Sequence, residues 1–301
     1  MKSQGRITSF LAISHLLPCV VFAGMFMLAS TQCGSGAVRV WSGSSSGYWS
    51  VGANWGGTAP VSGDDLVFPS GAANLLNTNN LTGLNLRSIT FSGSGYIIRG
   101  NSITISNGIS GQHAAGANTV ALPITLGAAQ TFDCVNAGAS QTFGGSITNA
   151  GFTLTFSGVG DIAVGIGTTG TIIVGTGGVT KNGTGTLTYY GDHNSYTGTT
   201  TVNRGTLVLN CFAYDYAFLG PLVISDGIGP AEVRLALSAE IPDNVSVTVN
   251  AGGTLNLDND NDVIGSLTLQ GGTASSGTGS LTLNGNLTVL ASSTTATING
   301  N

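Results

Sequence analysis

The sequence Gly265-Ser-Leu-Thr-Leu269 recurs as Gly279-Ser-Leu-Thr-Leu283 and, slightly changed, as Gly285-Asn-Leu-Thr-Val289. In each copy a glycine precedes a run in which apolar side chains alternate with hydroxyl or amide side chains. Alternation with a period of two is the pattern of a strand that has one buried face and one solvated face. Similar short runs, separated by Gly, Asn or Asp, extend back to Leu86-Arg-Ser-Ile-Thr-Phe91. The pattern therefore predicts many short strands joined by tight turns.

The likeness of these runs to one another predicts that they stack as repeated turns. Self-similar strand segments at short spacing are typical of solenoids, in which inward apolar residues form columns along the axis. We therefore predict an all-β chain folded as a right-handed, single-stranded parallel β-helix. With roughly 20 residues per turn, the chain would hold about 12 or 13 turns. A β-sandwich or a propeller is the alternative, but the sequence has no blade-length period.

The composition agrees with such a fold and excludes several classes of protein. Of 301 residues, 48 are glycine and only 7% are charged, against roughly 25% in an average globular protein. This glycine content without a G-X-Y period excludes collagen, and 41% hydrophobic residues argue against disorder. The net charge of −5 and the lack of a basic stripe argue against binding of nucleic acid. Ser, Thr and Asn must solvate the surface in place of charge.

The first 37 residues predict an export signal. Lys2 and Arg6 precede an apolar run at 16–29, and Ser35-Gly36-Ala37 offers a cleavage site between small residues. The run is shorter than the roughly 20 apolar residues that a membrane-spanning helix needs. We therefore expect residues 1–37 to be a signal peptide, and the mature chain to be exported without a membrane span.

The mature chain divides into two further segments. Residues 38–69 are rich in Gly and Ser and hold all three tryptophans, Trp41, Trp49 and Trp55. Because the end turn of a solenoid cannot bury its own core, we expect this segment to form an N-terminal aromatic cap. The β-helix itself is expected at 70–301. Its pattern runs to the last residue without a capping change, from which we expect a C-terminal truncation.

Residues 177–210 contain a longer phrase, Gly177-Gly-Val-Thr-Lys-Asn-Gly-Thr-Gly-Thr-Leu-Thr188, followed by Tyr196-Thr-Gly-Thr-Thr-Thr-Val-Asn-Arg-Gly-Thr-Leu-Val-Leu209. This phrase resembles the autotransporter-associated β-strand repeat. In that family a lysine-glycine-threonine-leucine strand leads to a tyrosine-threonine-glycine turn, a threonine-rich strand and a closing glycine-threonine-leucine strand. The matching positions, in order, are Lys181, Gly185, Leu187, Tyr196, Thr197, Gly198, Gly205 and Leu207. The sequence departs from the family at Tyr189-Tyr190, where small or apolar residues are usual.

The resemblance implies the passenger part of a bacterial surface protein, found outside the cell or at the outer-membrane surface. It implies adhesion or structural display without enzymatic activity, and an unknown extracellular or cell-surface ligand, of which a glycan is one option. Two alternatives stay open, a β-helix carbohydrate-active enzyme and a carbohydrate-binding module. An enzyme would need acidic and basic residues that converge over consecutive turns, and the chain has only 8 Lys and Arg.

Two groups of side chains are candidates for binding. The first is the alternating carboxylate run Asp258, Asp260 and Asp262. These oxygens would suit Ca²⁺, but the glycine and the distal glutamate of calcium loops are missing, and we favour a solvated turn. The second is the alternating aromatic stripe Phe212, Tyr214, Tyr216 and Phe218. Such rings would stack on sugars or pack a loop against the solenoid, and we favour packing.

No pattern predicts a catalytic residue or a cofactor. The segment Gly165-Ile-Gly167-Thr-Thr-Gly170 matches the dinucleotide fingerprint, but that motif needs a following helix and strands are expected on both sides. Cys134 and Cys211 remain once the signal is removed. We interpret each as a small buried apolar residue, with a disulfide in an oxidising compartment as the alternative.

Overall fold

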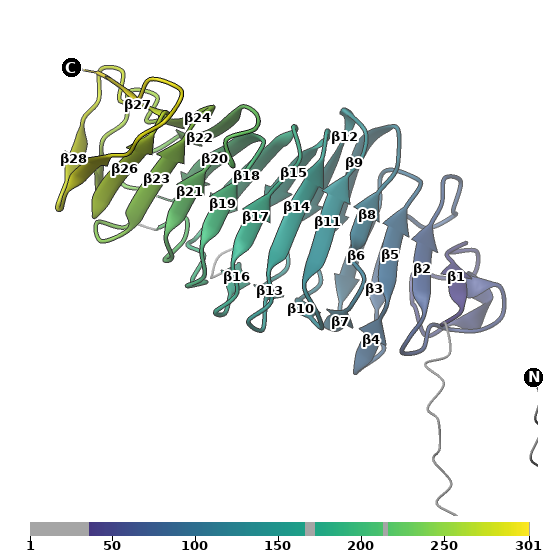
Figure 1. Cartoon of the computed structure of the whole chain (residues 1–301). Helices are drawn as coiled ribbons and strands as arrows, with labels where there is room; N and C mark the ends of the chain where they lie inside the picture. Colours follow the sequence, from purple (N-terminus) through teal and green to yellow (C-terminus); the bar gives the residue numbers. More distant parts are fainter. Residues whose placement is uncertain (1–35, 166–171, 213–215, 301) are drawn as a thin grey trace, which may run out of the picture. The chain divides into compact units, whose positions relative to one another are not determined.

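The computed structural model describes residues 36–165, 172–212 and 216–300 (Figure 1). Within these residues the regular structure consists of the strands β1 to β30 and one short 3-10 helix, η1 (Gly52–Trp55). The strands lie side by side in stacked turns, and the ladders that join them from turn to turn are parallel (Figure 1). The predicted all-β parallel solenoid is therefore confirmed, while its handedness stays a prediction.

Two long sheets run along the stack, and each takes one strand from almost every turn. Sheet A has the order β1 (Val38–Val40), β2 (Asp65–Phe68), β5 (Ser88–Phe91), β8 (Ile109–Gly111), β11 (Gln130–Cys134), β14 (Leu154–Gly158), β17 (Val179–Lys181), β19 (Thr200–Val202), β21 (Leu222–Ile224), β23 (Ser246–Asn250), β26 (Ser266–Gln270) and β29 (Leu287–Val289). Sheet B has the order β3 (Leu76–Asn79), β6 (Ile97–Gly100), β9 (Ala115–Val120), β12 (Gly138–Phe143), β15 (Asp161–Val164), β18 (Thr186–Gly191), β20 (Gly205–Cys211), β22 (Ala231–Leu235), β24 (Gly253–Asn256), β27 (Thr273–Ser275) and β30 (Thr297–Asn299).

A third side of the turn is strand only in parts of the stack. Sheet C consists of β4 (Leu84–Leu86), β7 (Ile103–Ile105), β10 (Ile124–Leu126), β13 (Ile147–Thr148) and β16 (Ile173–Val174). A two-stranded sheet near the other end consists of β25 (Asp262–Ile264) and β28 (Leu281–Leu283). Between them the chain closes the turn with loops.

The register between turns keeps one inward column in sheet A. The column is Leu66, Ile89, Ile109, Phe132, Phe156, Lys181, Val202, Ile224, Val249, Leu269 and Val289. All of its members except Val289 are buried. It advances in ten steps of 20 to 25 residues. The expected 12 or 13 turns are therefore too many, because several corners are longer than a 20-residue turn allows.

The outer face of sheet A carries hydroxyl groups where the inner face carries apolar groups. Thr155, Thr180 and Thr201 are paired in register on successive strands and are half-buried. Their neighbours on each strand are buried, because successive side chains of a strand point to opposite faces. The surface is therefore solvated by uncharged polar groups, as the composition predicts.

Aromatic side chains cover the first turn of the core. Trp41, Trp49 and Trp55 are buried, with ring centroids of Trp41 and Trp55 4.9 Å apart and those of Trp55 and Phe68 5.8 Å apart. The indole N–H of Trp49 donates to the side-chain oxygen of Asn77 at 2.7 Å. Because β1 and β2 are strands of sheet A, residues 38–69 are continuous with the solenoid. The segment boundaries at 37 and 69 stay predictions.

Two predictions fall on residues that the structure does not describe. Most of the expected signal peptide, residues 1–35, lies outside the described residues, and so does 166–171, which holds most of the dinucleotide-like match. In the part of the chain that is described, no helix has the length and apolar character needed to cross a membrane.

Candidate functional site

Residues 177–210 fold as two successive passes through the long sheets. Strands β17 and β19 are neighbours in sheet A, and β18 and β20 are neighbours in sheet B. The register pairs Val179 with Thr200 and Leu187 with Leu207. The two halves of the repeat motif thus lie directly on one another, so that the motif describes one turn stacked on the next.

Lys181 points into the core. It occupies the inward column of sheet A between Phe156 and Val202, and it is 4% exposed. Its Nζ donates hydrogen bonds to the carbonyl oxygens of Gly183 and Arg204, which joins the turn after β17 to the turn after β19. Burial lowers the pKa of Lys181 to about 8. The ammonium group therefore holds two turns together and is not offered to an external ligand.

Tyr196 is fully buried at the corner that precedes β19. Its hydroxyl lies 2.6 Å from the Thr200 hydroxyl and 3.3 Å from the Tyr189 hydroxyl. Burial raises the pKa of both tyrosines. Tyr189, which departs from the repeat pattern, thus points inward and contacts the motif residue Tyr196, whereas Tyr190 faces outward. The sequence analysis missed this pair, although the alternation after Leu187 contains the signal.

Three positions of the motif need glycine, because of a close approach between turns or a left-handed backbone. A Cβ atom at Gly198 would lie 2.4 Å from the carbonyl oxygen of Gly177 in the preceding turn. Gly205 has a φ of 66°, in the left-handed region that other L-residues rarely adopt. A Cβ atom at Gly185 would likewise lie 2.3 Å from the carbonyl oxygen of Gly160. These motif glycines therefore allow the backbones of successive turns to approach each other.

The remaining motif positions serve the core and the corner. Leu187 and Leu207 are buried partners in sheet B. Thr197 is exposed, and its N–H donates to the carbonyl oxygen of Gly175 at 3.0 Å. The motif therefore specifies a stackable turn and not a reactive centre.

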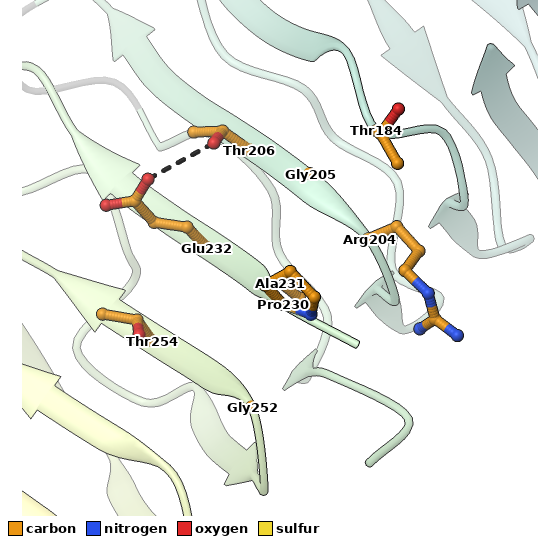
Figure 2. A pocket seen from close by; sticks show the side chains of 9 residues that line it. All are labelled: Thr184, Arg204, Gly205, Thr206, Pro230, Ala231, Glu232, Gly252 and Thr254. Atoms are coloured by element: carbon orange, nitrogen blue, oxygen red, sulfur yellow. Dashed lines mark hydrogen bonds between the residues drawn. The ribbon is translucent and has the colours of Figure 1, made fainter. Parts of the chain in front are cut away.

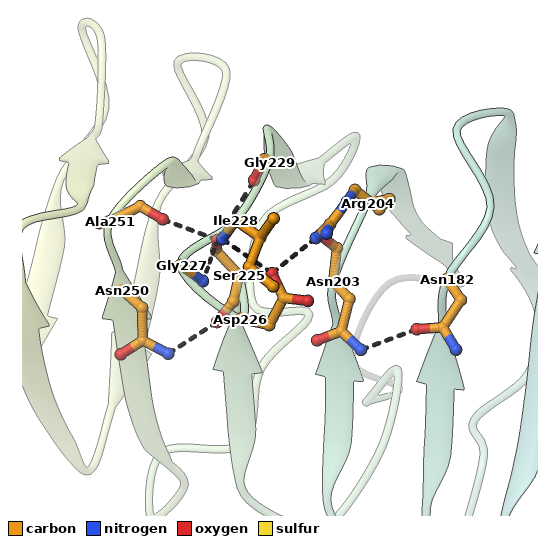
Figure 3. A network of polar contacts seen from close by, with 10 residues as sticks. All are labelled: Asn182, Asn203, Arg204, Ser225, Asp226, Gly227, Ile228, Gly229, Asn250 and Ala251. Atoms are coloured by element: carbon orange, nitrogen blue, oxygen red, sulfur yellow. Dashed lines mark hydrogen bonds and ion pairs between the residues drawn. The ribbon is translucent and has the colours of Figure 1, made fainter.

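A row of amide side chains follows the ends of the sheet A strands (Figure 3). The Asn203 amide donates to the side-chain oxygen of Asn182 at 2.7 Å, and the Asn250 amide donates to the carbonyl oxygen of Ser225 at 2.7 Å. Each bond crosses from one turn to its neighbour. The row therefore supplies hydrogen bonds between neighbouring turns at the corners, where the strand hydrogen bonds have ended.

An ion pair lies in the same row (Figure 3). Arg204 Nη1 is 2.6 Å from Asp226 Oδ1, which also accepts the Ile228 N–H at 3.0 Å. The Arg204 guanidinium, with this backbone bond, holds the pKa of Asp226 below its usual range. The Ser225 hydroxyl accepts from the N–H of Gly227 at 3.0 Å. The loop after β21 is thus held in one conformation, with Ile228 at its tip.

The three candidate cation ligands are held by different partners. Asp258 pairs with Arg234 at 3.1 Å, and Asp260 accepts the Ser238 hydroxyl at 2.8 Å. Asp262 is buried as the first residue of β25. Among the described residues, no three His, Cys, Asp or Glu side chains converge as metal ligands would.

The backbone explains why the carboxylates diverge. Asp258 and Asn259 both have positive φ, 50° and 76°, so the chain turns between β24 and β25 and does not continue as a strand. Alternate residues therefore do not share a face. The interpretation as a solvated turn fits Asp258 and Asp260, whereas for Asp262 it is wrong because that side chain is buried.

The aromatic stripe is not one face of a strand. Strand β20 ends at Cys211, Phe212 is 54% exposed, and Phe218 is fully buried in the core. Tyr216 is half-buried, and Tyr214 lies outside the described residues. Packing accounts for Phe218, which no ligand can reach. Stacking of a sugar on Phe212 stays a prediction.

A buried acidic pair was missed by the sequence analysis. Glu240 is 1% exposed; its Oε1 accepts the backbone N–H of Cys211 at 2.8 Å, and its Oε2 has no hydrogen-bond partner. Asp262 accepts the N–H of Ile241 at 3.2 Å and of Val263 at 2.8 Å. Burial raises the pKa of Glu240 to about 8 and that of Asp262 to about 6. Both neighbours of Glu240 in the sequence, Ala239 and Ile241, are apolar, and alternation alone would place Glu240 on the opposite, solvated face, so only the stacking of turns reveals its burial.

The two cysteines of the solenoid are separate. Cys134 lies in β11 and Cys211 in β20; both are buried, and neither forms a disulfide. Burial raises the pKa of the Cys134 thiol to about 11. The interpretation as small buried residues is confirmed.

One family model matches the chain, that of the passenger-associated-transport-repeat, over residues 179–209. The match coincides with β17 to β20, the strands that carry the motif. A parallel β-solenoid with this repeat fits an autotransporter passenger-type repeat protein, and the repeat family implies an exported surface protein. No curated protein and no solved structure matches the chain.

Proposed function

We propose that the chain is the passenger part of an exported bacterial surface protein and works as a rigid, non-catalytic scaffold for display and adhesion. The observation that carries this proposal is the repeat at 179–209, folded as two in-register turns inside a longer stack of the same kind. A repeat that only extends a stack contributes length and stiffness. Those properties suit a protein that holds a binding surface away from a cell.

Two features of the chain suit an extracellular environment. Cys134 is buried and its thiol pKa is raised to about 11, so the reactive thiolate form is scarce at neutral pH. The outward surface is solvated mainly by hydroxyl and amide groups and carries few charges. Because salt screens only interactions between charges, it has little effect on this solvation. Both features keep the stack intact in oxidising or saline surroundings.

The placement of the acidic residues supports a non-catalytic role. Asp258 and Asp260 are bound to Arg234 and Ser238, and Glu240 and Asp262 are buried in the core. General acid and base catalysis needs such groups within reach of one substrate atom. These four carboxylates point to different partners and leave no shared reaction centre.

Display can be tested with an epitope tag at Ile228, which is 81% exposed at the tip of a held loop. The tagged full-length gene is expressed in its host bacterium, and intact and lysed cells are labelled with the same antibody. We expect labelling of intact cells, and its loss when residues 2–37 are deleted. A tag that is detected only after lysis would refute display.

Adhesion and the absence of catalysis need a separate measurement. Beads coated with the purified chain are expected to attach to cells or glycan-coated surfaces more strongly than beads coated with albumin. The same preparation is incubated with soluble polysaccharides and assayed for new reducing ends. Bead attachment equal to that of albumin would refute adhesion, and release of sugars would refute the non-catalytic role.

A further inference from the structure

The outer face of sheet B carries one column of polar side chains in register. From strand to strand the column is Ser140, Asp161, Thr186, Thr206, Glu232, Thr254, Thr273 and Thr297. Neighbouring strands lie about 4.8 Å apart, so a hydroxyl or carboxylate recurs at that interval along the axis. The register makes this a straight line of donors and acceptors, although the residues are spread over 158 positions of sequence.

A hollow of about 420 Å³ lies on this column over β20, β22 and β24 (Figure 2). Thr206, Glu232 and Thr254 line it, and the exposed backbone at Gly205 and Gly252 forms part of its wall. Figure 2 shows Glu232 between the two threonines, with its carboxylate bonded to the Thr206 hydroxyl at 3.3 Å. The hollow is therefore open, and its hydroxyl and carboxylate groups stand beside the apolar side chains of Pro230 and Ala231.

A second hollow of about 290 Å³ lies over β12, β15 and β18. Ser140, Asp161 and Thr186 of the same column line it, together with Tyr190. Thr186 of this hollow is the register partner of Thr206 in the first. The two hollows therefore lie over two consecutive groups of three strands, and the strip of sheet B that carries both is a candidate groove.

The charge of the groove selects against acidic ligands. Glu232 accepts from the Thr206 hydroxyl and the Asn256 amide, both neutral, at 3.3 and 2.9 Å. Arg204, at the margin of the first hollow, is neutralised by Asp226. Asp161 adds a second carboxylate, which accepts the Thr186 N–H at 2.9 Å. The groove is thus negative, and a ligand with carboxylate or sulfate groups would be repelled.

We propose that this groove binds a linear, neutral polysaccharide of the β-1,4-linked kind, which lies along the solenoid axis. In such a chain each pyranose ring advances by about one strand spacing, so successive rings meet successive members of the polar column. The carboxylates of Glu232 and Asp161 accept hydrogen bonds from sugar hydroxyls, and the hydroxyls of the threonines both donate and accept hydrogen bonds. Contacts repeated along one line make the affinity depend on ligand length.

This inference names the ligand of the adhesion proposed above and rests on it for its biological role. The binding itself is measured on the purified chain in solution. A failure of surface display would leave the binding result standing, and a failure of binding would leave the display result standing.

The test is titration calorimetry with cello-, manno- and chito-oligosaccharides of two to six rings, all neutral and β-1,4-linked. We expect at least one series to bind, with an affinity at least tenfold higher for six rings than for two. Malto-oligosaccharides are expected to bind at least tenfold more weakly at six rings, because the α-1,4 chain curves away from a straight column. Oligogalacturonate is expected to bind more weakly still, because it is anionic.

Variants assign the binding to the groove. Glu232→Ala should weaken the best hexasaccharide at least tenfold, and Thr206→Val about threefold, since charged partners make the stronger hydrogen bonds. Thr201→Val, on the outer face of sheet A, is the matched control and should leave binding unchanged. Circular dichroism and thermal melting check that each variant is folded.

Several outcomes would overturn the inference. These are no binding by all three neutral series, equal affinity for two and six rings, tighter binding of oligogalacturonate, or unchanged binding by folded Glu232→Ala.

Discussion

Replacing Glu240 by glutamine should make the stability of the solenoid depend less on pH. The carboxyl is buried, and one of its oxygens has no partner. Burial raises its pKa from 4.5 to about 8, although the backbone N–H of Cys211 acts in the opposite direction. Between these pH values the folded protein keeps a proton that the unfolded chain has lost. The free energy of unfolding therefore falls as the pH rises from 4.5 to about 8, and this contribution is constant above that.

The size of the effect follows from the two pKa values. Each pH unit between pKa values of 4.5 and about 8 corresponds to about 1.36 kcal/mol, which gives roughly 5 kcal/mol in total. Glutamine has the same shape, keeps the carbonyl oxygen that accepts from Cys211, and cannot ionise. At about pH 4 the variant and the natural protein should therefore be similarly stable. At about pH 9 the variant should be more stable by up to roughly 5 kcal/mol.

The measurement is unfolding in guanidinium chloride, followed by far-ultraviolet circular dichroism at several pH values from about 4 to about 9. Circular dichroism reports on all turns, whereas Trp41, Trp49 and Trp55 report only on the first turns. Asp243→Asn is the control, because Asp243 is an exposed carboxylate three residues from Glu240. A difference between Glu240→Gln and the natural protein that stays constant with pH would refute the argument, since Glu240 would then be ionised in the folded state.

Three further substitutions test other parts of the stack. Burial lowers the pKa of Lys181 from 10.5 to about 8, so the unfolding free energy of the natural protein should rise by roughly 3 kcal/mol between these pH values. Lys181→Met should abolish this rise, which denaturation at both ends of the pH range measures. Tyr196→Phe should cost about 1–3 kcal/mol, because the buried Thr200 hydroxyl loses its partner at 2.6 Å, and an unchanged denaturation midpoint would contradict this. Trp49→Ala should cost about 3–5 kcal/mol and speed amide hydrogen exchange in β2 and β5. Equal acceleration in β23 and β26 would show that the aromatic cover does not act locally.

The sequence analysis succeeded where a residue's environment follows from its nearest neighbours. Leu267 and Leu269 are buried, and the polar residues between and beside them lie on the other face. This alternation of apolar and polar residues specifies the two faces of a strand. The same rule applies to Lys181, which shares the inward side with Val179. The alternation from Val179 to Lys181 predicts that Lys181 is buried, although its charge suggests a surface position.

Residue environments are harder to predict at the corners, where the chain leaves the strand pattern. The expected solvated turn is present at Asp258, where that residue and Asn259 have positive φ, but nothing in the sequence indicates that Asp262 is buried. The alternate spacing of the aromatic residues from Phe212 onward suggests one face of a strand, yet β20 ends one residue before Phe212. Local sequence does not state where a strand stops when turn residues and strand residues have similar character.

The chain's own order of apolar, hydroxyl and glycine residues was enough to determine that it forms short parallel strands, and that the segment at 177–210 is a stackable turn. Those properties depend on neighbours a few residues away. Only the stacked structure decided which distant residues meet, because the corners vary and the turns differ in length, for example 25 residues from Phe156 to Lys181 and 20 from Val249 to Leu269. The burial of Glu240 against Cys211, 29 residues earlier, and the alignment of Thr206 with Glu232 both arise from that register.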